Sequence, residues 1–141
     1  MNAPLYTKEI LRLAADLPDP RQLDQEDGSA ELRSQTCGSR IKVAVKLDPQ
    51  ARVHDVSLSI QACAFGQASS ALMVKGAAGR RREEVATALE ALTSWLDGTR
   101  DNPGTWPGLE ALAPARSRKG RHGAILLPFR ALLAAMEGSA K

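Results

Sequence analysis

Apolar and polar residues alternate most clearly in the middle of the chain, over residues 40–47 and again over residues 52–61. This period of two is typical of strands that bury one face. A weaker alternation over residues 30–36 indicates a short strand before them. The connections at residues 37–39 and 48–51 are short and contain the glycine or proline typical of turns. Three strands joined in this way predict an antiparallel meander.

Helical spacing of apolar residues governs the rest of the chain. The first helical segment has Thr7 as a possible cap and ends at the cluster Pro18-Asp19-Pro20. Gly98 is a suitable C-cap for a later helix, and Pro128 either kinks the last helix or lies in its first turn. The helical segments span residues 5–17, 65–75, 82–96, 106–113 and 123–136.

This order of elements predicts an α+β fold in a single domain over residues 1–141. An N-terminal helix comes first, a three-stranded antiparallel sheet follows, and the C-terminal helices pack on one face of that sheet. The polar, acidic stretch 22–29 is expected to be a loop and residues 116–120 a flexible basic link. The last residues, 138–141, are expected to fray.

Composition narrows the classes of function. The net charge is only +3 and aromatic residues make up 4% of the chain, whereas nucleic-acid binders usually add stacking aromatics to a basic surface. The basic clusters at 80–82 and 116–121 are therefore interpreted as solvated faces or protein-docking patches. No apolar run approaches the roughly 20 residues of a membrane span, and the first residues lack a signal-peptide pattern. We expect a soluble cytoplasmic protein whose two cysteines are thiols, with a transient bridge between them as an alternative.

Three residues are candidates for metal chemistry: Cys37, Cys63 and His122. Cys63 falls where a strand is followed by a helix, and the partial positive charge of a helix start stabilises a thiolate. It is equally well explained as a buried cysteine that fills space. Cys37 falls in a turn, and His122 falls where the basic link enters a helix, whereas His54 is expected to be exposed on its strand. Their spacing matches no short zinc-finger pattern, but thiolate and imidazole ligands suit zinc, copper(I) or iron–sulfur clusters.

Several motifs occur in the same order as in a known family. The segment Leu5-Tyr6-Thr7-Lys8-Glu9-Ile10-Leu11 resembles the opening helix of the IscU/NifU N-terminal-domain family of iron–sulfur cluster assembly scaffolds. The chain also resembles the SufU-type relatives of that family, nearly over its whole length. The remaining motifs are Thr36-Cys37-Gly38-Ser39, Cys63 with Ala68-Ser69-Ser70, Ala113-Pro114-Ala115-Arg116 and Arg121-His122-Gly123.

The resemblance implies that Cys37, Cys63 and His122 bind iron or a [2Fe–2S] cluster, with zinc as the alternative metal. It also implies a cysteine desulfurase and iron–sulfur acceptor proteins as partners, and a role other than that of an enzyme. The chain departs from the family pattern at two ligand positions. Gly123 stands where the third cysteine is expected, and Ser39 stands where the aspartate of Cys-Gly-Asp is expected.

Three functions are compatible with these residues. The first is a scaffold or carrier for iron or a cluster. The second is a degenerate family member that binds assembly partners without a cluster, which the two missing ligands favour. The third is a SufU-like, zinc-bound sulfur acceptor, which the Pro114-Ala115-Arg116 motif favours. The sequence does not indicate an oligomeric state.

Overall fold

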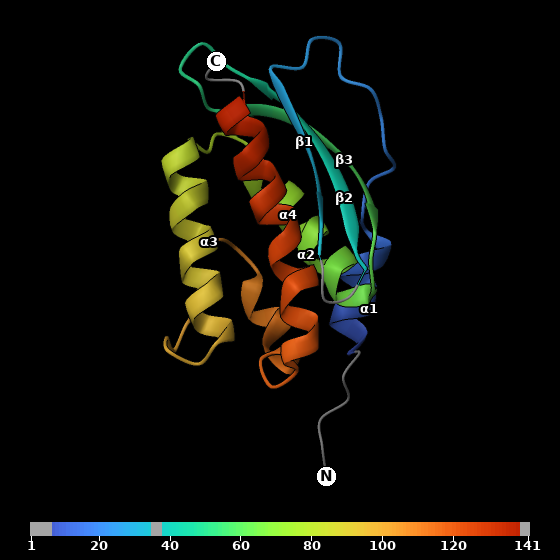
Figure 1. Ribbon diagram of the computed structural model, residues 1–141, viewed down its shortest axis with the longest axis vertical. Coiled ribbons are helices and arrows are strands. Elements are labelled where there is room, and N and C mark those ends of the chain that lie inside the picture. Colours follow the sequence, from blue (N-terminus) through green and yellow to red (C-terminus); the bar gives the residue numbers. More distant parts are fainter. Residues whose placement is uncertain (1–6, 35–37, 139–141) are drawn as a thin grey trace.

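An antiparallel sheet with helices on one face organises the chain, as the computed structural model in Figure 1 shows. The structure describes residues 7–34 and 38–138. The strands β1 (Gly28–Arg33), β2 (Arg40–Leu47) and β3 (Val53–Gln61) lie side by side in the order of the sequence. The predicted α+β meander is therefore confirmed.

The helices form the layer beneath the sheet. α1 (Lys8–Ala15) precedes the strands, and α2 (Ala64–Ala77), α3 (Arg82–Leu96), the 3-10 helix η1 (Leu109–Ala115) and α4 (Lys119–Gly138) follow them. α2 packs against β3, and α4 packs against β1, β2 and α2. α3 and α1 lie outside these two central helices, α3 against α4 and α1 against α2 (Figure 1).

Alternation along the strands produces the core. Ile41, Val43 and Val45 of β2 have no exposed surface, because their side chains all point to the helical face. Their register partners on β3 are the apolar residues Ile60, Leu58 and Val56. The polar residues between them lie on the opposite face of the sheet. One hydrophobic cluster joins these side chains to the buried faces of the helices.

Trp106 fastens the segment after α3 onto α2. Its indole Nε1 donates a hydrogen bond to the Leu72 carbonyl over 2.9 Å, and its ring meets Phe129 edge-to-face with centroids 5.1 Å apart. A Cβ at Gly76 would lie 2.5 Å from Nε1, so glycine is needed for this close approach. On the ring lies the Arg80 guanidinium, 4.9 Å from the centroid.

The first elements differ at their ends from the sequence prediction. α1 covers residues 8–15 rather than 5–17, because Thr7 caps it by accepting a hydrogen bond from the Ile10 amide over 3.1 Å. β1 begins at Gly28, inside the predicted loop, because its pairing extends to Val45. Residues 35 and 36 of the predicted strand lie outside the described residues, as does the part of the predicted first helix before Thr7.

The later elements differ as well. The short helix predicted over 106–113 is a 3-10 helix that starts only at Leu109, because Gly108 has a left-handed φ of +84° that an α-helix cannot contain. α4 begins at Lys119, so the predicted flexible link is partly helical. Pro128 lies in the interior of α4, so of the two predicted alternatives the place in the first turn is excluded. Gly138 belongs to α4, and the remaining terminal residues lie outside the described part.

Candidate metal centre

Two of the predicted site segments meet at one end of the sheet. Arg40, the first residue of β2, is paired with Gln61 at the end of β3 and with Arg33 at the end of β1. The turn between β1 and β2 therefore lies at the same end of the sheet as Cys63, which comes two residues after Gln61. Cys37 belongs to this turn but lies outside the described residues.

Cys63 is the N-cap residue of α2. Its backbone is extended, with φ −66° and ψ 173°, and its carbonyl accepts the first helical hydrogen bond from the Gln67 amide over 3.0 Å. Its side chain makes no capping bond and is partly exposed as a free thiol. The first amide groups of a helix lack intrahelical partners and carry partial positive charge. The position therefore leaves the Cys63 sulfur accessible at a helix start, where it can meet a metal or a sulfur donor.

The described part of the turn supports a tight connection. Gly38 has φ +73°, and a Cβ there would meet no heavy atom within 4 Å, so this glycine is required by its backbone conformation rather than by space. Its amide donates to the Ser34 carbonyl over 3.2 Å, and the Ser34 amide donates to the Ser39 carbonyl over 2.8 Å. Ser39 is buried, with 3% of its surface exposed.

The start of α4 lies against the start of α2. A Cβ at Gly66 would be 3.3 Å from the Ala124 Cβ and 3.4 Å from its carbonyl oxygen. The Ala124 carbonyl lacks its usual helical donor, because Pro128, four residues later, has no amide hydrogen. The neighbouring Ile125 carbonyl accepts a hydrogen bond from the Ser69 hydroxyl of α2 over 2.6 Å. Gly123 comes directly before this contact, so it lies on the part of α4 that is closest to the first turn of α2.

His122 is engaged elsewhere. Its Nε2 is 2.9 Å from the Ala115 carbonyl oxygen and 3.1 Å from that of Arg116. Carbonyl oxygens only accept, so Nε2 donates, and the lone pair of the neutral ring is then on Nδ1. Residues two apart on a helix point in directions about 200° apart. The imidazole therefore faces the end of η1, while Ala124 faces α2.

The structure thus brings the β1–β2 turn, Cys63 and the start of α4 to one corner, and it turns the His122 ring toward η1. Within residues 7–34 and 38–138, no three His, Cys, Asp or Glu side chains are grouped to hold a metal. Cys37 is not among these residues. His54 is exposed on β3, as predicted.

Two arginines of the basic clusters have structural partners that sequence reasoning missed. Arg116 donates from Nε to the Trp95 carbonyl over 2.9 Å, and its guanidinium lies 5.2 Å from the Trp95 ring centroid. Arg80 donates from Nε to the Gly76 carbonyl over 2.9 Å. By contrast, Arg118 and Lys119 are exposed beside the start of α4. The presence of two tryptophans is the sequence feature that could have indicated these arginine contacts, because a guanidinium stacks readily on an indole ring.

Comparison with known proteins decides the family. The family model described as "NifU-like N terminal domain" matches residues 5–103, well over half of the chain. The chain belongs to the NifU-like N-terminal domain family. The resemblance seen in the motifs is therefore confirmed. The matched region includes Cys37 and Cys63. It ends before η1 and before α4, the helix that carries His122.

Known structures extend the likeness to the whole fold. A crystal structure of a nitrogen-fixing NifU-like protein (N-terminal) from Brucella abortus is 31% identical, with a TM-score of 0.89 over 96% of this chain and 94% of that one. A SUF-system scaffold structure from Fervidobacterium islandicum, described as putative in its name, shares the fold at 17% identity, with a TM-score of 0.84 over 94% of this chain and 96% of that one.

One curated relative matches in sequence. It is the iron–sulfur cluster assembly scaffold protein IscU of Streptococcus pyogenes, 28% identical over 86 residues. That match covers 60% of this chain and 53% of the relative, so it spans about half of the relative's length. Separately, none of the helices in the described residues has the length and apolar character needed to cross a membrane.

Proposed function

We propose that this protein is a scaffold or carrier for iron–sulfur cluster assembly, with iron or a [2Fe–2S] cluster as its cargo. Family membership supports this function. The observation that carries the proposal is the position of Cys63, a partly exposed thiol at a helix start on the end of the sheet that also holds the Cys37 turn. In this role the chain receives sulfur from a cysteine desulfurase and passes the cargo to an acceptor protein, without acting as an enzyme, in the cytoplasm.

The ligand set proposed for the cargo is Cys37, Cys63 and His122. Two thiolates are the ligands that iron–sulfur chemistry prefers, and an imidazole is a known third type. In the structure the Nε2–H of His122 is held by the Ala115 and Arg116 carbonyl oxygens, and binding to the cargo would exchange these hydrogen bonds for a metal bond. A turn of its side chain away from η1 is required if the ring is to reach the thiols.

Gly123 gives the proposed site an open position. Because a [2Fe–2S] cluster prefers four strong ligands, loss of one thiolate weakens retention. Weak retention suits a protein that hands its cargo on, and the missing ligand can come from a small thiol or an acceptor protein. Replacing Gly123 with cysteine is therefore expected to increase cluster retention.

A cluster-free binding module is the second candidate function, and Gly123 and Ser39 favour it. The third function, a zinc-bound sulfur acceptor, has less support from the structure. Two residues of its Pro114-Ala115-Arg116 motif have structural roles here, since Ala115 accepts from His122 and Arg116 stacks on Trp95. This motif is thus explained without a sulfur-transfer function.

The metal and sulfide content of protein purified without oxygen tests these functions. Iron, zinc and acid-labile sulfide are measured for the wild type and for Cys37→Ala, Cys63→Ala and His122→Ala, with His54→Ala as the matched histidine control. The proposal expects iron or sulfide that falls in the three site variants and is unchanged in His54→Ala. Zinc without sulfide supports the sulfur acceptor, and an empty protein that still binds a desulfurase supports the binding module.

A further inference from the structure

Basic side chains gather at the end of the molecule that holds Cys63. The start of α4 lies against the start of α2, and β2 begins at the same end, where Arg40 is paired with Gln61. α1 packs beside α2 and runs parallel to it, since Asp16 at its end pairs with Lys75 in the last turn of α2 over 3.2 Å. α1 therefore also begins at this end. The exposed or half-buried basic residues here are Lys8, Arg33, Arg40, Arg118, Lys119 and Arg121.

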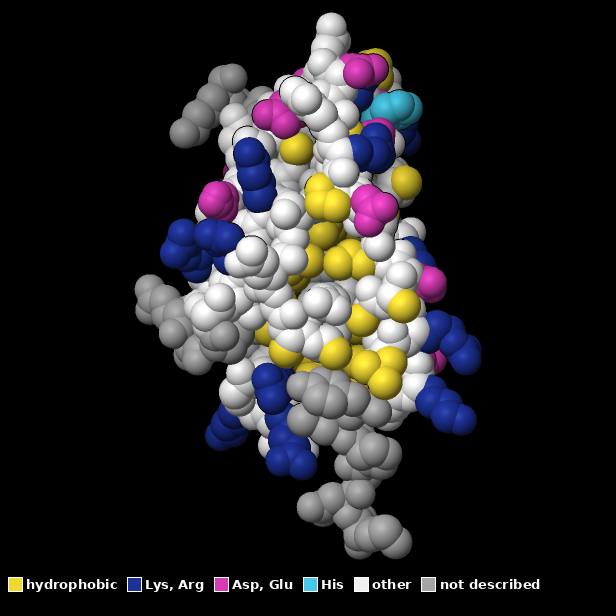
Figure 2. All heavy atoms as spheres, turned by 90° about the vertical axis from the view of Figure 1, so that its right-hand side faces the viewer, with side chains coloured by type: hydrophobic (Ala, Val, Ile, Leu, Met, Phe, Trp, Pro, Cys, Tyr) yellow, Lys and Arg dark blue, Asp and Glu magenta, His cyan; other side chains and the backbone are white. Residues whose placement is uncertain are grey.

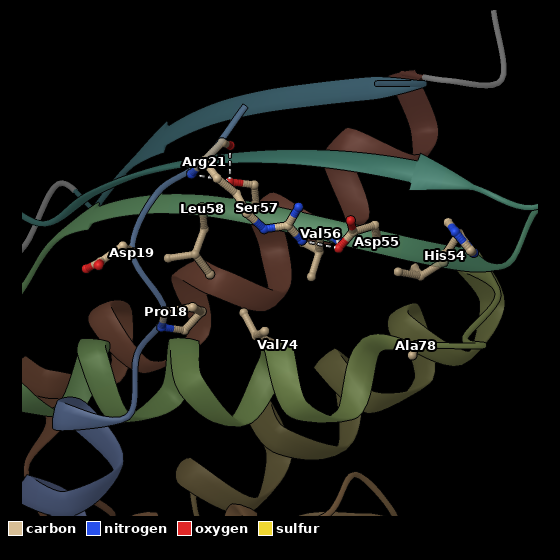
Figure 3. Close-up of a pocket in the computed structure, with 11 residues that line it drawn as sticks. Pro18, Asp19, Arg21, His54, Asp55, Val56, Ser57, Leu58, Val74 and Ala78 are labelled. Carbon is tan, nitrogen blue, oxygen red and sulfur yellow. Dashed lines mark hydrogen bonds and ion pairs between the residues drawn. The ribbon is translucent and has the colours of Figure 1, made fainter. Parts of the chain in front are cut away.

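The ion pairs among the residues that the structure describes lie away from this end. Arg21, in the linker between α1 and β1, pairs with Asp55 of β3 (Figure 3), and Arg52 pairs with Asp48 in the β2–β3 turn over 3.0 Å. The remaining pairs involve the ends of α1 and α2 and the start of α3. The basic residues at the Cys63 end take part in none of these pairs.

Two of these basic residues face each other across the sheet. Arg33 of β1 lies directly opposite Arg40 of β2, and like charges in this position are destabilising. The Arg40 guanidinium donates to the neutral side-chain oxygen of Gln61 over 2.9 Å. The Arg33 side chain has no partner in the described part of the chain. A carboxylate from another molecule would relieve the repulsion that the chain itself leaves uncompensated.

Surface charge thus divides between the two ends of the molecule. In Figure 2, dark blue side chains dominate the lower end of the face shown, whereas magenta ones lie mostly in its upper part. The linker between α1 and β1, residues 16–27, runs along the upper part in Figure 1 and is rich in acidic residues. Charges of one sign act together over about 10 Å at 0.1 M salt. The Cys63 end therefore attracts an acidic surface and repels a basic one.

The same end lacks the side chains that a nucleic acid needs. Binding of single strands relies on exposed aromatic rings on which bases stack, and the tryptophan and phenylalanine side chains of this protein are all buried. The basic residues also surround the thiol through which the proposed function passes the cargo on. The occupant that fits this position is the protein on the other side of that transfer.

We propose that the Cys63 end docks an acidic surface of the protein that receives the cargo. This inference rests on the proposed function, because it assigns the partner of the same site. Carboxylates of the partner pair with Arg118 and Lys119 at the start of α4 and with Arg33 and Arg40 at the edge of the sheet. The acidic linker at the opposite end disfavours a reversed orientation.

Association with a fluorescently labelled apo-ferredoxin that has an acidic surface tests this docking without metal. The variant Arg118→Glu/Lys119→Glu reverses two exposed charges, and Arg81→Glu/Arg82→Glu makes the same change in net charge at the start of α3, beside the ends of β2 and α4. Both are expected to fold, because glutamate is favourable at a helix start. In stopped-flow mixing at low salt, the first variant is expected to associate about tenfold more slowly than the wild type and the second at nearly the wild-type rate. The difference should shrink at high salt.

The same preparations separate this docking from the proposed function. Iron and acid-labile sulfide contents of Arg118→Glu/Lys119→Glu are expected to equal those of the wild type. The docking is overturned by equal slowing in the two variants, by unchanged association in the first, or by a DNA duplex that binds as tightly as the ferredoxin. Loss of iron and sulfide with unchanged association assigns the charges to the cargo and also overturns it. Association by a wild type that never holds iron or sulfide supports the acidic docking surface and refutes the proposed function.

Discussion

Gly76→Ala tests the packing of α2 most sharply, because the added methyl group has no space. Its Cβ would lie 2.5 Å from Nε1 and 2.7 Å from Cε2 of Trp106, a side chain with only 2% of its surface exposed. The indole must therefore move away from the Leu72 carbonyl that its Nε1–H now bonds.

The size of the effect follows from three contributions. Overpacking of a core costs about 1–3 kcal/mol, and a buried N–H group that loses its partner costs about 1–3 kcal/mol. Alanine is favoured over glycine within a helix by roughly 0.5–1 kcal/mol, which offsets part of this loss. We expect a net loss of about 2–3 kcal/mol in the free energy of unfolding, and a fall in Tm of roughly 8 °C for a domain of this size.

Urea unfolding followed by circular dichroism and by tryptophan fluorescence measures this loss. Gly120→Ala is the matched control, since it is also a helical glycine but a Cβ there meets no heavy atom within 4 Å. The control is expected to be neutral or slightly stabilising. A Gly76→Ala protein that is as stable as the control would show that Trp106 does not pack on α2 as described.

Three further predictions concern the site and the linker. Gly66→Ala places a Cβ 2.6 Å from the Ala62 Cβ and 3.3 Å from the Ala124 Cβ, so it is expected to lower stability by about 1–2 kcal/mol in urea unfolding and to disturb the Cys63 corner; unchanged stability contradicts the α2–α4 contact. Arg116→Lys keeps the charge but loses the guanidinium contact with Trp95, and a drop in Tm that Arg118→Lys does not show is expected in a thermal scan. The Arg21 hydrogen bond lowers the pKa of Asp55 from its ordinary value, with help from the Val56 amide. The stability that this adds is present above the ordinary pKa and is lost as pH falls through the lowered pKa, so the difference in unfolding free energy between wild type and Asp55→Asn should vanish in acid. A difference that stays constant across pH refutes this prediction.

The sheet could be predicted from the sequence because a single residue pattern determines it. Ile41, Val43 and Val45 alternate with polar residues, and this pattern is retained whatever the chain packs against. The start of β1 was not predictable in the same way. Gly28 and Ser29 have no strand signal of their own, and they are extended because β2 offers backbone partners to them.

The candidate site was predictable in its parts but not in its assembly. The position of Cys63 at a strand–helix junction follows from local patterns, and the structure agrees with it. The orientation of His122 depends on the Ala115 and Arg116 carbonyls, which are placed by the 3-10 helix before it. The sequence predicted a helix over residues 106–113 but not its 3-10 form or its start at Leu109, because Gly108 and the docking of Trp106 determine where it begins.

Cluster transfer after anaerobic reconstitution tests the central claim most directly. The protein is incubated with ferrous iron, cysteine, a cysteine desulfurase and dithiothreitol, the thiol that reduces the delivered sulfane sulfur to sulfide. It is then re-isolated and mixed with an apo-ferredoxin whose visible absorption reports the transferred cluster. The account predicts transfer by the wild type, loss of transfer for Cys63→Ala and Cys37→Ala, and slower transfer with stronger retention for Gly123→Cys. Equal ferredoxin maturation by the wild type and Cys63→Ala, or none by any form, would contradict it.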